Sequence, residues 1–453
     1  MDKSQVSRLG SGRIPALVFS MGLPAVAAQL VSVLYSTVDR MYIGNIPEVG
    51  RDALTGVGVA LPIIIVMSAF AFMVGMGGAP LAAMRLGADD RKGAERVLGN
   101  ALGLLLLLSV ILTAVLQILK RPMLMAIGAS EATWQYAGPY LGLYLWATPA
   151  MMLTLGLNPY IAAQGRPKAA MLAIALGAGV NMLLDPVFIF TLGLGVRGAA
   201  LATVVSQTLS AAWSIAVLRS SKSTLRIAVK SMAPDGKTVA GILRLGISPL
   251  LMMSTESMVS ITLNNSLKQY GGDLYVGSMT ILLSLLQLVM TPLNGFAQGT
   301  QPILSYNYGA KQMDRVRDTL KITVSVSVAI ALTLSLAAIV FPRFFAGLFG
   351  KDAELIDLTA RMLPVFLCGM FAVGAQITCQ SAFLALGQAR LTLFVTLLRK
   401  VVFLIPLAIV LPRFIGVRGV YYAEPISDLT ASAITVILFV MLLPKILDKK
   451  MKE

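Results

Sequence analysis

The feature that most constrains this chain is a series of apolar stretches, each long enough to cross a lipid bilayer. A helix of about 20 apolar residues spans a hydrocarbon core of about 30 Å. We find twelve such stretches: 14–43, 53–83, 97–119, 134–163, 169–191, 199–218, 239–267, 274–306, 322–341, 358–386, 391–411 and 420–443. Because the bilayer interior offers the backbone no hydrogen-bond partner, each stretch is expected to be helical. The sequence therefore predicts an all-α integral membrane protein with twelve transmembrane helices.

The composition excludes a soluble protein. Charged residues make up 13% of the chain and hydrophobic residues 57%, whereas a soluble domain carries about 25% charged residues. A net charge of +16 would suggest nucleic acid as the partner of a soluble protein, but here the Lys and Arg residues lie in short connections and at the termini. We therefore expect the lipid bilayer as partner and no nucleic acid.

The distribution of Lys and Arg predicts the orientation in the membrane. About 24 of these residues fall on the side that carries both termini, and about 11 fall on the opposite side. The positive-inside rule then places both termini in the cytoplasm of a multi-pass plasma-membrane protein.

The second half of the chain repeats the first about 222 residues later. Gly195-Val-Arg-Gly198 returns as Gly416-Val-Arg-Gly419, and Gly165 returns as Gly387. A repeat of this size is half a protein rather than a solenoid unit, so we expect two pseudo-symmetric lobes of six helices each.

The predicted domains follow from these spans and from the longest polar connection. They are a cytoplasmic N-terminus 1–13, an N-lobe 14–218, a cytoplasmic linker 219–238, a C-lobe 239–443 and a cytoplasmic tail 444–453. Short loops and the lack of an appended domain favour a monomer.

The two halves differ in their polar residues. Asp39, Asn181 and Asp185 fall opposite Asn264, Phe403 and Leu407 in the repeat. The first lobe therefore holds carboxyl groups where the second is mostly apolar.

Four polar residues of the N-lobe are expected at one depth in the membrane. Asn181 and Asp185 are four residues apart and share a helix face, while Asp39 and Thr203 lie at similar distances from the same surface. An ionised Asp in hydrocarbon costs several kcal/mol, so such a group binds a proton or Na⁺ or faces water. The chain has no histidine. The alternative is that Asp39 and Asp185 only cap helix ends.

Four segments carry a family resemblance: residues 38–44, 164–167, 181–190 and 198–203. With the tandem six-helix lobes, they resemble the multidrug and toxic-compound extrusion (MATE) family of secondary antiporters. The resemblance implies a transporter, not an enzyme, without a cofactor. It would export amphipathic, cationic organic compounds in exchange for H⁺ or Na⁺.

The same resemblance assigns roles to the N-lobe residues. Asp39, Asn181, Asp185 and Thr203 are similar to the cation-coupling site of the DinF-like branch, which we favour over the NorM-like branch. Glu256 matches the glutamate that the NorM-like branch uses for Na⁺ in its seventh span, but the acidic residue of that branch's tenth span is missing.

Further charged residues lie within the spans of the C-lobe. Arg399 and Lys400 are at mid-depth in the eleventh span, Asp428 is at comparable depth in the twelfth, and Glu424 is nearer the outside. Opposite charges at one depth usually pair. We expect either a structural ion pair or a pH-sensitive element that switches the lobes.

Candidate substrate contacts surround the N-lobe site. They are Tyr35, one turn before Asp39, with Tyr140, Tyr144 and Met151 in the fourth span and Gln207 in the sixth. A flippase for lipid-linked oligosaccharides or lipids, from the same superfamily, is the alternative function, and a membrane enzyme or receptor is a remote one.

Overall fold

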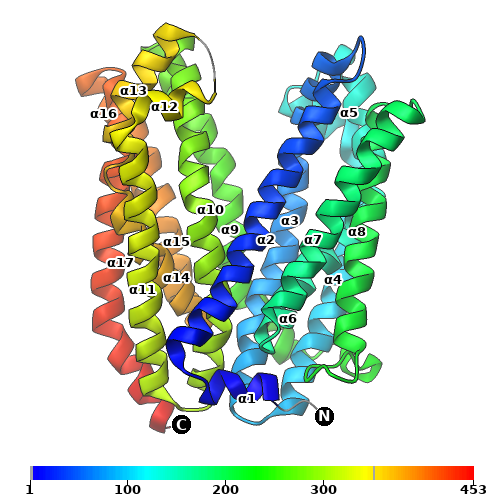
Figure 1. The fold of residues 1–453 in the computed structure, drawn as a ribbon, viewed down its shortest axis with the longest axis vertical. Helices are drawn as coiled ribbons and strands as arrows, with labels where there is room; N and C mark the ends of the chain where they lie inside the picture. The colour runs from blue at the N-terminus through cyan, green and yellow to red at the C-terminus, as the bar shows by residue number, and fades with distance from the viewer. Residues whose placement is uncertain (1–3, 350–351, 453) are drawn as a thin grey trace. The chain divides into compact units, whose positions relative to one another are not determined.

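The structure is a computed structural model that describes residues 4–349 and 352–452, and all regular elements in these ranges are helical (Figure 1). The first part of the chain forms α1 (Ser4–Ser11), α2 (Ile14–Gly44), α3 (Gly50–Gly87), α4 (Arg91–Ile127), α5 (Glu131–Tyr144), η1 (Leu145–Ala147), α6 (Thr148–Ala163), α7 (Pro167–Pro186), η2 (Val187–Thr191), α8 (Val196–Arg219) and η3 (Val229–Met232). The second part forms α9 (Gly236–Tyr270), α10 (Asp273–Gly309), α11 (Met313–Val340), α12 (Pro342–Gly347), α13 (Ala353–Leu367), α14 (Met370–Ala385), α15 (Ala389–Leu397), η4 (Leu398–Leu404), α16 (Ile405–Ile415) and α17 (Arg418–Lys452). Residues 1–3 and 453 of the expected cytoplasmic ends lie outside the described residues.

The helices have the length and composition of membrane spans. Within the described ranges, eleven helical stretches are long and apolar enough to cross a bilayer, and a twelfth results if α13 and α14, bent by 50°, form one span. The predicted all-helical membrane protein is confirmed.

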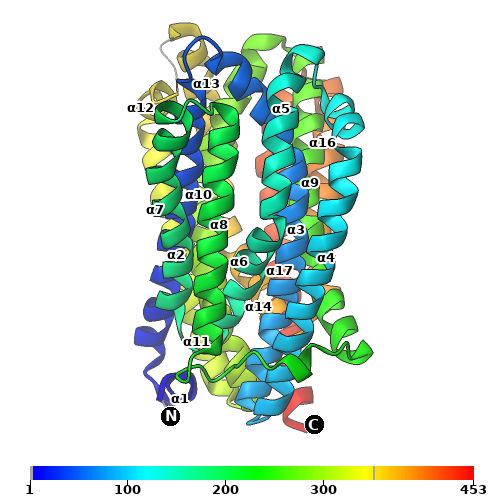
Figure 2. The same cartoon turned by 90° about the vertical axis from the view of Figure 1, so that its right-hand side faces the viewer.

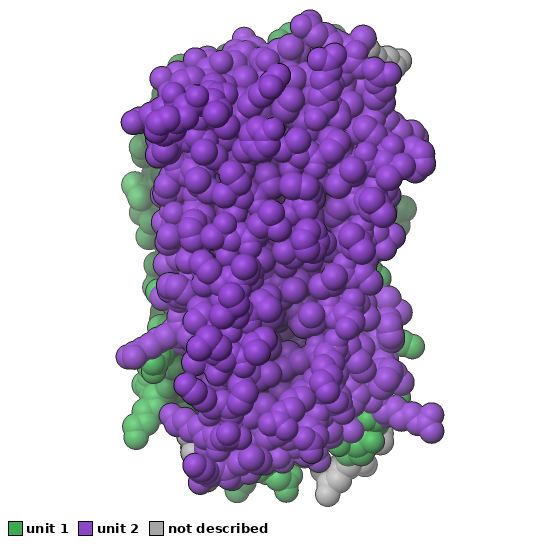
Figure 3. All heavy atoms as spheres, turned by 90° about the vertical axis from the view of Figure 1, so that its left-hand side faces the viewer, with its two compact units in different colours: residues 1–12, 27–250 green, residues 13–26, 251–453 purple. Residues whose placement is uncertain are grey.

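The chain forms two compact units. Unit 1 comprises Met1–Gly12 and Ala27–Leu250, and unit 2 comprises Arg13–Val26 and Leu251–Glu453 (Figure 3). The units differ from a simple division into halves, because the first part of α2 belongs to unit 2 and the first part of α9 belongs to unit 1. Each unit therefore contains the beginning of a span whose remainder belongs to the other.

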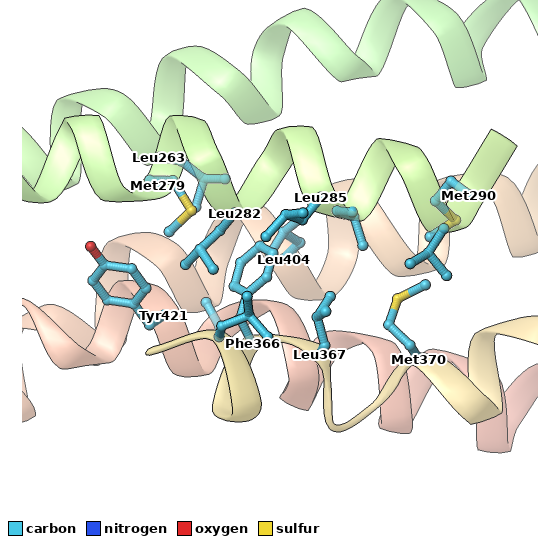
Figure 4. Packing of buried hydrophobic residues seen from close by; sticks show 14 of the residues in the cluster. Leu263, Met279, Leu282, Leu285, Met290, Phe366, Leu367, Met370, Leu404 and Tyr421 are labelled. Carbon is cyan, nitrogen blue, oxygen red and sulfur yellow. The ribbon is translucent and has the colours of Figure 1, made fainter. Parts of the chain in front are cut away.

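Helix packing within each unit follows the repeat. In unit 1, α3 packs against α4, α5 and α6, and α8 packs against α5, α6 and α7 (Figure 2). In unit 2, α14 packs against α10, α11 and α17. An apolar cluster fills unit 2, where Phe366, Leu404 and Leu285 lie together (Figure 4).

The first parts of α2 and α9 each pack closely against a helix of the unit to which they belong, through a pair of glycines. In unit 1, a Cβ atom built on Gly77 of α3 would lie 2.8 Å from the Cα atom of Gly246 of α9. In unit 2, a Cβ atom on Gly299 of α10 would lie 2.8 Å from the Cα atom of Gly22 of α2. Only residues without a side chain allow two helices to approach this closely. The two pairs occupy equivalent positions in the repeat.

The repeated Gly-Val-Arg-Gly motif builds the turn before α8 and before α17. Gly195 and Gly416 have positive φ angles of 56° and 65°, a backbone conformation that favours glycine. A Cβ atom on Gly198 would lie 2.6 Å from the carbonyl of Phe188, so α8 begins tightly packed on η2. This turn fixes α7 beside α8, and these helices carry most of the polar residues described below.

Two spans contain a π-helical segment. In η2, the Leu192 N–H donates to the Val187 carbonyl five residues earlier, and in η4 the Ile405 N–H donates in the same way to Lys400. A proline adjoins each segment, Pro186 before η2 and Pro406 after η4. Because proline cannot donate a backbone hydrogen bond, it disturbs the regular α-helical ladder. Both π segments lie next to charged residues, and π segments are frequent at functional sites.

The glycine contact predicts a difference between two positions on α3. Gly77→Val should lower the melting temperature of the detergent-solubilised protein, because overpacking costs about 1–3 kcal/mol. At Gly58, a built Cβ meets no atom within 4 Å. The melting temperature of Gly58→Val should therefore be close to that of the unmodified protein. Equal melting temperatures for the two variants would show that the close approach of α3 and α9 does not stabilise unit 1.

Candidate functional site

The predicted polar residues of the first lobe meet inside unit 1. The Asn181 amide on α7 donates to the Asp185 carboxylate over 3.3 Å and to the Thr203 hydroxyl on α8 over 3.4 Å. Asn181 and Asp185 are fully buried and Thr203 is 2% exposed. The one-turn spacing on α7 and the tight turn into α8 place these side chains together. We call Asp39, Asn181, Asp185 and Thr203 the polar cluster.

Asp39 of α2 completes the cluster. This residue is half-buried, and its carboxyl group lies within hydrogen-bonding reach of the Asp185 carboxyl group. Asp39 Oδ1, Asp185 Oδ2 and Asn181 Oδ1 are buried without a donor among the described residues. Two carboxyl groups can hydrogen-bond only if a proton lies between them, and otherwise a cation must offset their repulsion. The pair is therefore suited to binding and releasing a small cation.

Three tyrosines surround the two carboxyl groups. Tyr35, Tyr140 and Tyr144 all lie within electrostatic range of Asp39. The rings of Tyr140 and Tyr144 are 5.9 Å apart, and both residues are buried on α5. Tyr35 is half-buried, one turn from Asp39 on α2. Aromatic faces beside a negative site can bind an organic cation by cation–π contact.

The two remaining predicted contact residues also lie near this group. The Tyr144 hydroxyl contacts the Met151 sulfur at 3.5 Å, and the Ser68 hydroxyl contacts the same sulfur at 3.8 Å. Gln207 lies one turn after Thr203 on α8, and its Oε1 atom is buried without a donor among the described residues. All five predicted contact residues belong to unit 1.

A second charged cluster lies inside unit 2. The Arg399 guanidinium on η4 donates to Asp428 over 2.6 Å and to Glu424 over 3.2 Å, both on α17. Asp428 is fully buried and Glu424 is 3% exposed. One guanidinium is thus paired with two carboxyl groups. One oxygen of each carboxyl group accepts no hydrogen bond from the described part of the chain. Arg399 has the ion-pair partners that its depth predicted.

Lys400 has a different partner from the one expected. Its ammonium group pairs with the carboxylate of Glu256 on α9, rather than with Glu424 or Asp428. The Glu256 side chain is 64% exposed, so this pair is far less desolvated than the Arg399 cluster. The sequence left Glu256 open as a coupling residue or as a member of an ion pair, and in the structure it forms an ion pair. Among the described residues, no group of three or more His, Cys, Asp or Glu side chains is arranged to hold a metal ion.

In unit 2, the positions equivalent to Asn181 and Asp185 of the polar cluster are apolar. Phe403 and Leu407, opposite Asn181 and Asp185 in the repeat, are partly buried, and Leu407 packs against the apolar cluster of unit 2. The two units therefore share a backbone plan but not this site.

Two polar residues that the sequence does not single out, Gln164 and Asn100, hold the connection between α8 and α9. The side-chain oxygen Oε1 of Gln164 accepts hydrogen bonds from the Ser223 hydroxyl and from the backbone N–H groups of Thr224 and Leu225, at 2.9–3.2 Å. The Asn100 amide donates to the Ser231 carbonyl over 3.1 Å. Gln164 belongs to one of the segments that carry the family resemblance, but nothing in its local sequence indicates this distant contact.

Comparisons with known proteins agree with this structure. Residues 24–187 and 249–410 each match the MatE family model. The multidrug export protein MepA of Staphylococcus haemolyticus is 26% identical over 406 residues, which cover 90% of this chain and 89% of the relative. The crystal structure of MATE in the bent conformation has a TM-score of 0.93, at 23% identity over 99% of each chain. A MOP superfamily transporter from Pyrococcus furiosus has a TM-score of 0.91, at 24% identity over 98% of this chain and 99% of that one.

The Arg399 cluster predicts a strong effect on stability. Arg399→Gln should destabilise the protein by about 3–5 kcal/mol, because it leaves two buried carboxyl groups without their cation. Lys400→Gln, whose partner is exposed, should cost about 1 kcal/mol or less. Thermal unfolding in one detergent at neutral pH compares the variants.

A double variant tests whether the loss of stability in Arg399→Gln comes from the lost charge or from altered packing. If charge causes the loss, Arg399→Gln combined with Asp428→Asn should recover part of the stability. Equal melting temperatures for Arg399→Gln and Lys400→Gln would contradict the assignment.

Proposed function

The chain belongs to the MatE family of membrane transporters, and we propose that it exports amphipathic, cationic organic compounds in exchange for H⁺ or Na⁺. It is a transporter rather than an enzyme. The name of the similar staphylococcal MepA protein, a multidrug export protein, supports a broad substrate range. The Asp39–Asp185 carboxyl pair carries the proposal.

The polar cluster and the tyrosines around it would bind substrate and coupling ion by the same negative charge. When Asp39 or Asp185 holds a proton or Na⁺, the charge that attracts an organic cation is reduced. When the ion leaves, Tyr35, Tyr140 and Tyr144 offer aromatic faces beside an unneutralised carboxylate. Substrate and ion therefore compete, and this competition is the simplest form of exchange.

α2 would link the bound ion to a change of shape. Asp39 lies in the part of α2 that belongs to unit 1, and residues up to Val26 belong to unit 2. Pro24 lies within this helix and removes one backbone hydrogen bond, which allows bending. Forming or breaking the contact between Asp39 and Asp185 would change how strongly α2 is bent at Pro24. Exchange requires that substrate and ion favour different shapes.

The proposed topology follows the sequence analysis. The chain would cross the plasma membrane twelve times, in two lobes of six helices, with both termini in the cytoplasm and the monomer as the working form. Counting α13 and α14 as one span gives the twelve.

The polar cluster favours a DinF-like over a NorM-like coupling site. Its four members lie together in unit 1, whereas Glu256 pairs with Lys400. α14, which contains Gln376 and Gln380, contributes no carboxyl group.

Transport by the purified protein in lipid vesicles tests the function. We expect ethidium to move against its gradient when a pH gradient or a Na⁺ gradient is imposed, and comparing the two gradients identifies the ion. Asp39→Asn and Asp185→Asn should each slow this transport about tenfold or more, within the range of ordinary coupling free energies. Asp52→Asn serves as the control, because Asp52 is an exposed acid in the first turn of α3.

Two results would overturn the proposal. One is gradient-driven transport at the native rate by both cluster variants, provided that they melt like the unmodified protein. The other is the absence of transport by the unmodified protein under either gradient with any cationic dye.

A further inference from the structure

A large cavity lies on unit 1 apart from the polar cluster. It has a volume of about 970 Å³ and is bounded by α4, by α5 with η1, and by the first turn of α8. These elements pack together in the structure (Figure 2). α5 separates the cavity from the site described above, because Gly142 and Leu143 line the cavity while Tyr140 and Tyr144 lie within electrostatic range of Asp39.

Two cations in this cavity have no acidic partner. Lys120 is half-buried, and its ammonium group donates to the Gln117 side chain over 3.0 Å. Arg197 is exposed in the first turn of α8. No acidic side chain in the described ranges lies within ion-pair distance of either residue. The neighbouring Arg121, by contrast, pairs with Glu131 at 3.2 Å. The cavity therefore has an uncompensated positive charge.

The rest of the cavity is lined mainly by apolar and aromatic side chains of α4, α5 and η1. Trp134 lies in the first turn of α5, and Trp146 in η1 is 68% exposed. Val110 lies ten residues before Lys120 on α4, about 15 Å along the helix axis at 1.5 Å per residue. Tryptophan is enriched where a membrane helix reaches the headgroups. The cavity thus combines two cations with a largely apolar and aromatic lining.

The equivalent place in unit 2 has a different character. α11 corresponds to α4 in the repeat, and a cavity of about 430 Å³ lies at its end, beside α12 and α13. Its Arg343 pairs with Asp357 at 3.0 Å. Arg361 also lines this smaller cavity and has no acidic partner in the described ranges, so the positive charge there is only partly compensated.

We propose that this cavity of unit 1 binds an anionic phospholipid, with its phosphate between Lys120 and Arg197 and an acyl chain along α4 toward Val110. A basic pocket between membrane helices attracts anionic headgroups, while the apolar lining would bind a chain that a free phosphate lacks. In the proposed topology the lipid belongs to the outer leaflet. The site does not depend on the proposed transport activity.

Lipid retention by the purified protein tests this site. After exchange into a mixture of phosphatidylglycerol and phosphatidylcholine, mass spectrometry of the intact complex should show phosphatidylglycerol preferred by about tenfold, as expected for two cations near one phosphate. The double variant Lys120→Gln, Arg197→Gln should lose this preference. Lys120→Arg, Arg197→Lys keeps both charges and should retain it.

Arg418→Gln is the matched control, because Arg418 is the exposed counterpart of Arg197 in the repeated Gly-Val-Arg-Gly motif. Its preference should equal that of the unmodified protein. The proposal is overturned if the unmodified protein binds the two lipids equally or if the charge-removing double variant keeps its preference. It is also overturned if soluble glycerol phosphate competes as well as the lipid does, since the site would then recognise phosphate without a chain.

Discussion

Two carboxyl groups that face each other in an apolar helical unit are the constraint on which this account depends. Asp185 is fully buried, and its partner Asp39 is within hydrogen-bonding reach. Leaving both groups charged in such a place is unfavourable, and Asn181 supplies a donor to only one carboxyl oxygen. The site therefore needs a small cation from outside the chain. Under the proposed function, this requirement would make the state of the site sensitive to proton or sodium concentration and to a competing organic cation.

In unit 2, an arginine of the chain itself compensates the charge of the buried acids. Arg399 stands as a permanent cation between Glu424 and Asp428, so these acids do not need an exchangeable ion to the same degree. The two units have equivalent helices, glycine contacts and turns. Unit 2 contains its own counter-ion, Arg399, for its buried acids, whereas the polar cluster of unit 1 contains none among the described residues. Under the proposed function, this difference would let a duplicated fold hold one coupling site while the buried acids of the other half stay paired with Arg399.

Much of the fold and of the polar cluster could be predicted from the sequence. Apolar length requires helices, and the four-residue spacing of Asn181 and Asp185 requires a shared face. The exchange of helix ends between the units could not be predicted, because a repeat shows which segments are equivalent but not which unit packs around each. Gly22 and Gly246 occupy equivalent positions in the repeat, but their close contacts with α10 and α3 appear only with the partner helices in place.

The partner of Lys400 could not be predicted from the sequence either. Lys400 contacts Glu256, 144 residues away, although depth alone suggested the acids of α17 as partners. Depth places residues in a plane but does not say which helices are neighbours. The basic cavity beside α4 went unnoticed for the same reason, since Lys120 and Arg197 are distant in the chain and each resembles an ordinary residue near a membrane surface.

The release of an ion on substrate binding tests the central claim most directly. Ethidium would be added to the detergent-solubilised protein in weakly buffered solution, with a pH indicator and a sodium electrode recording the response. The account predicts that the native protein releases a proton or a sodium ion as the dye binds, and that Asp185→Asn releases neither. Dye binding without ion release by the native protein, or unchanged release by the variant, would contradict it.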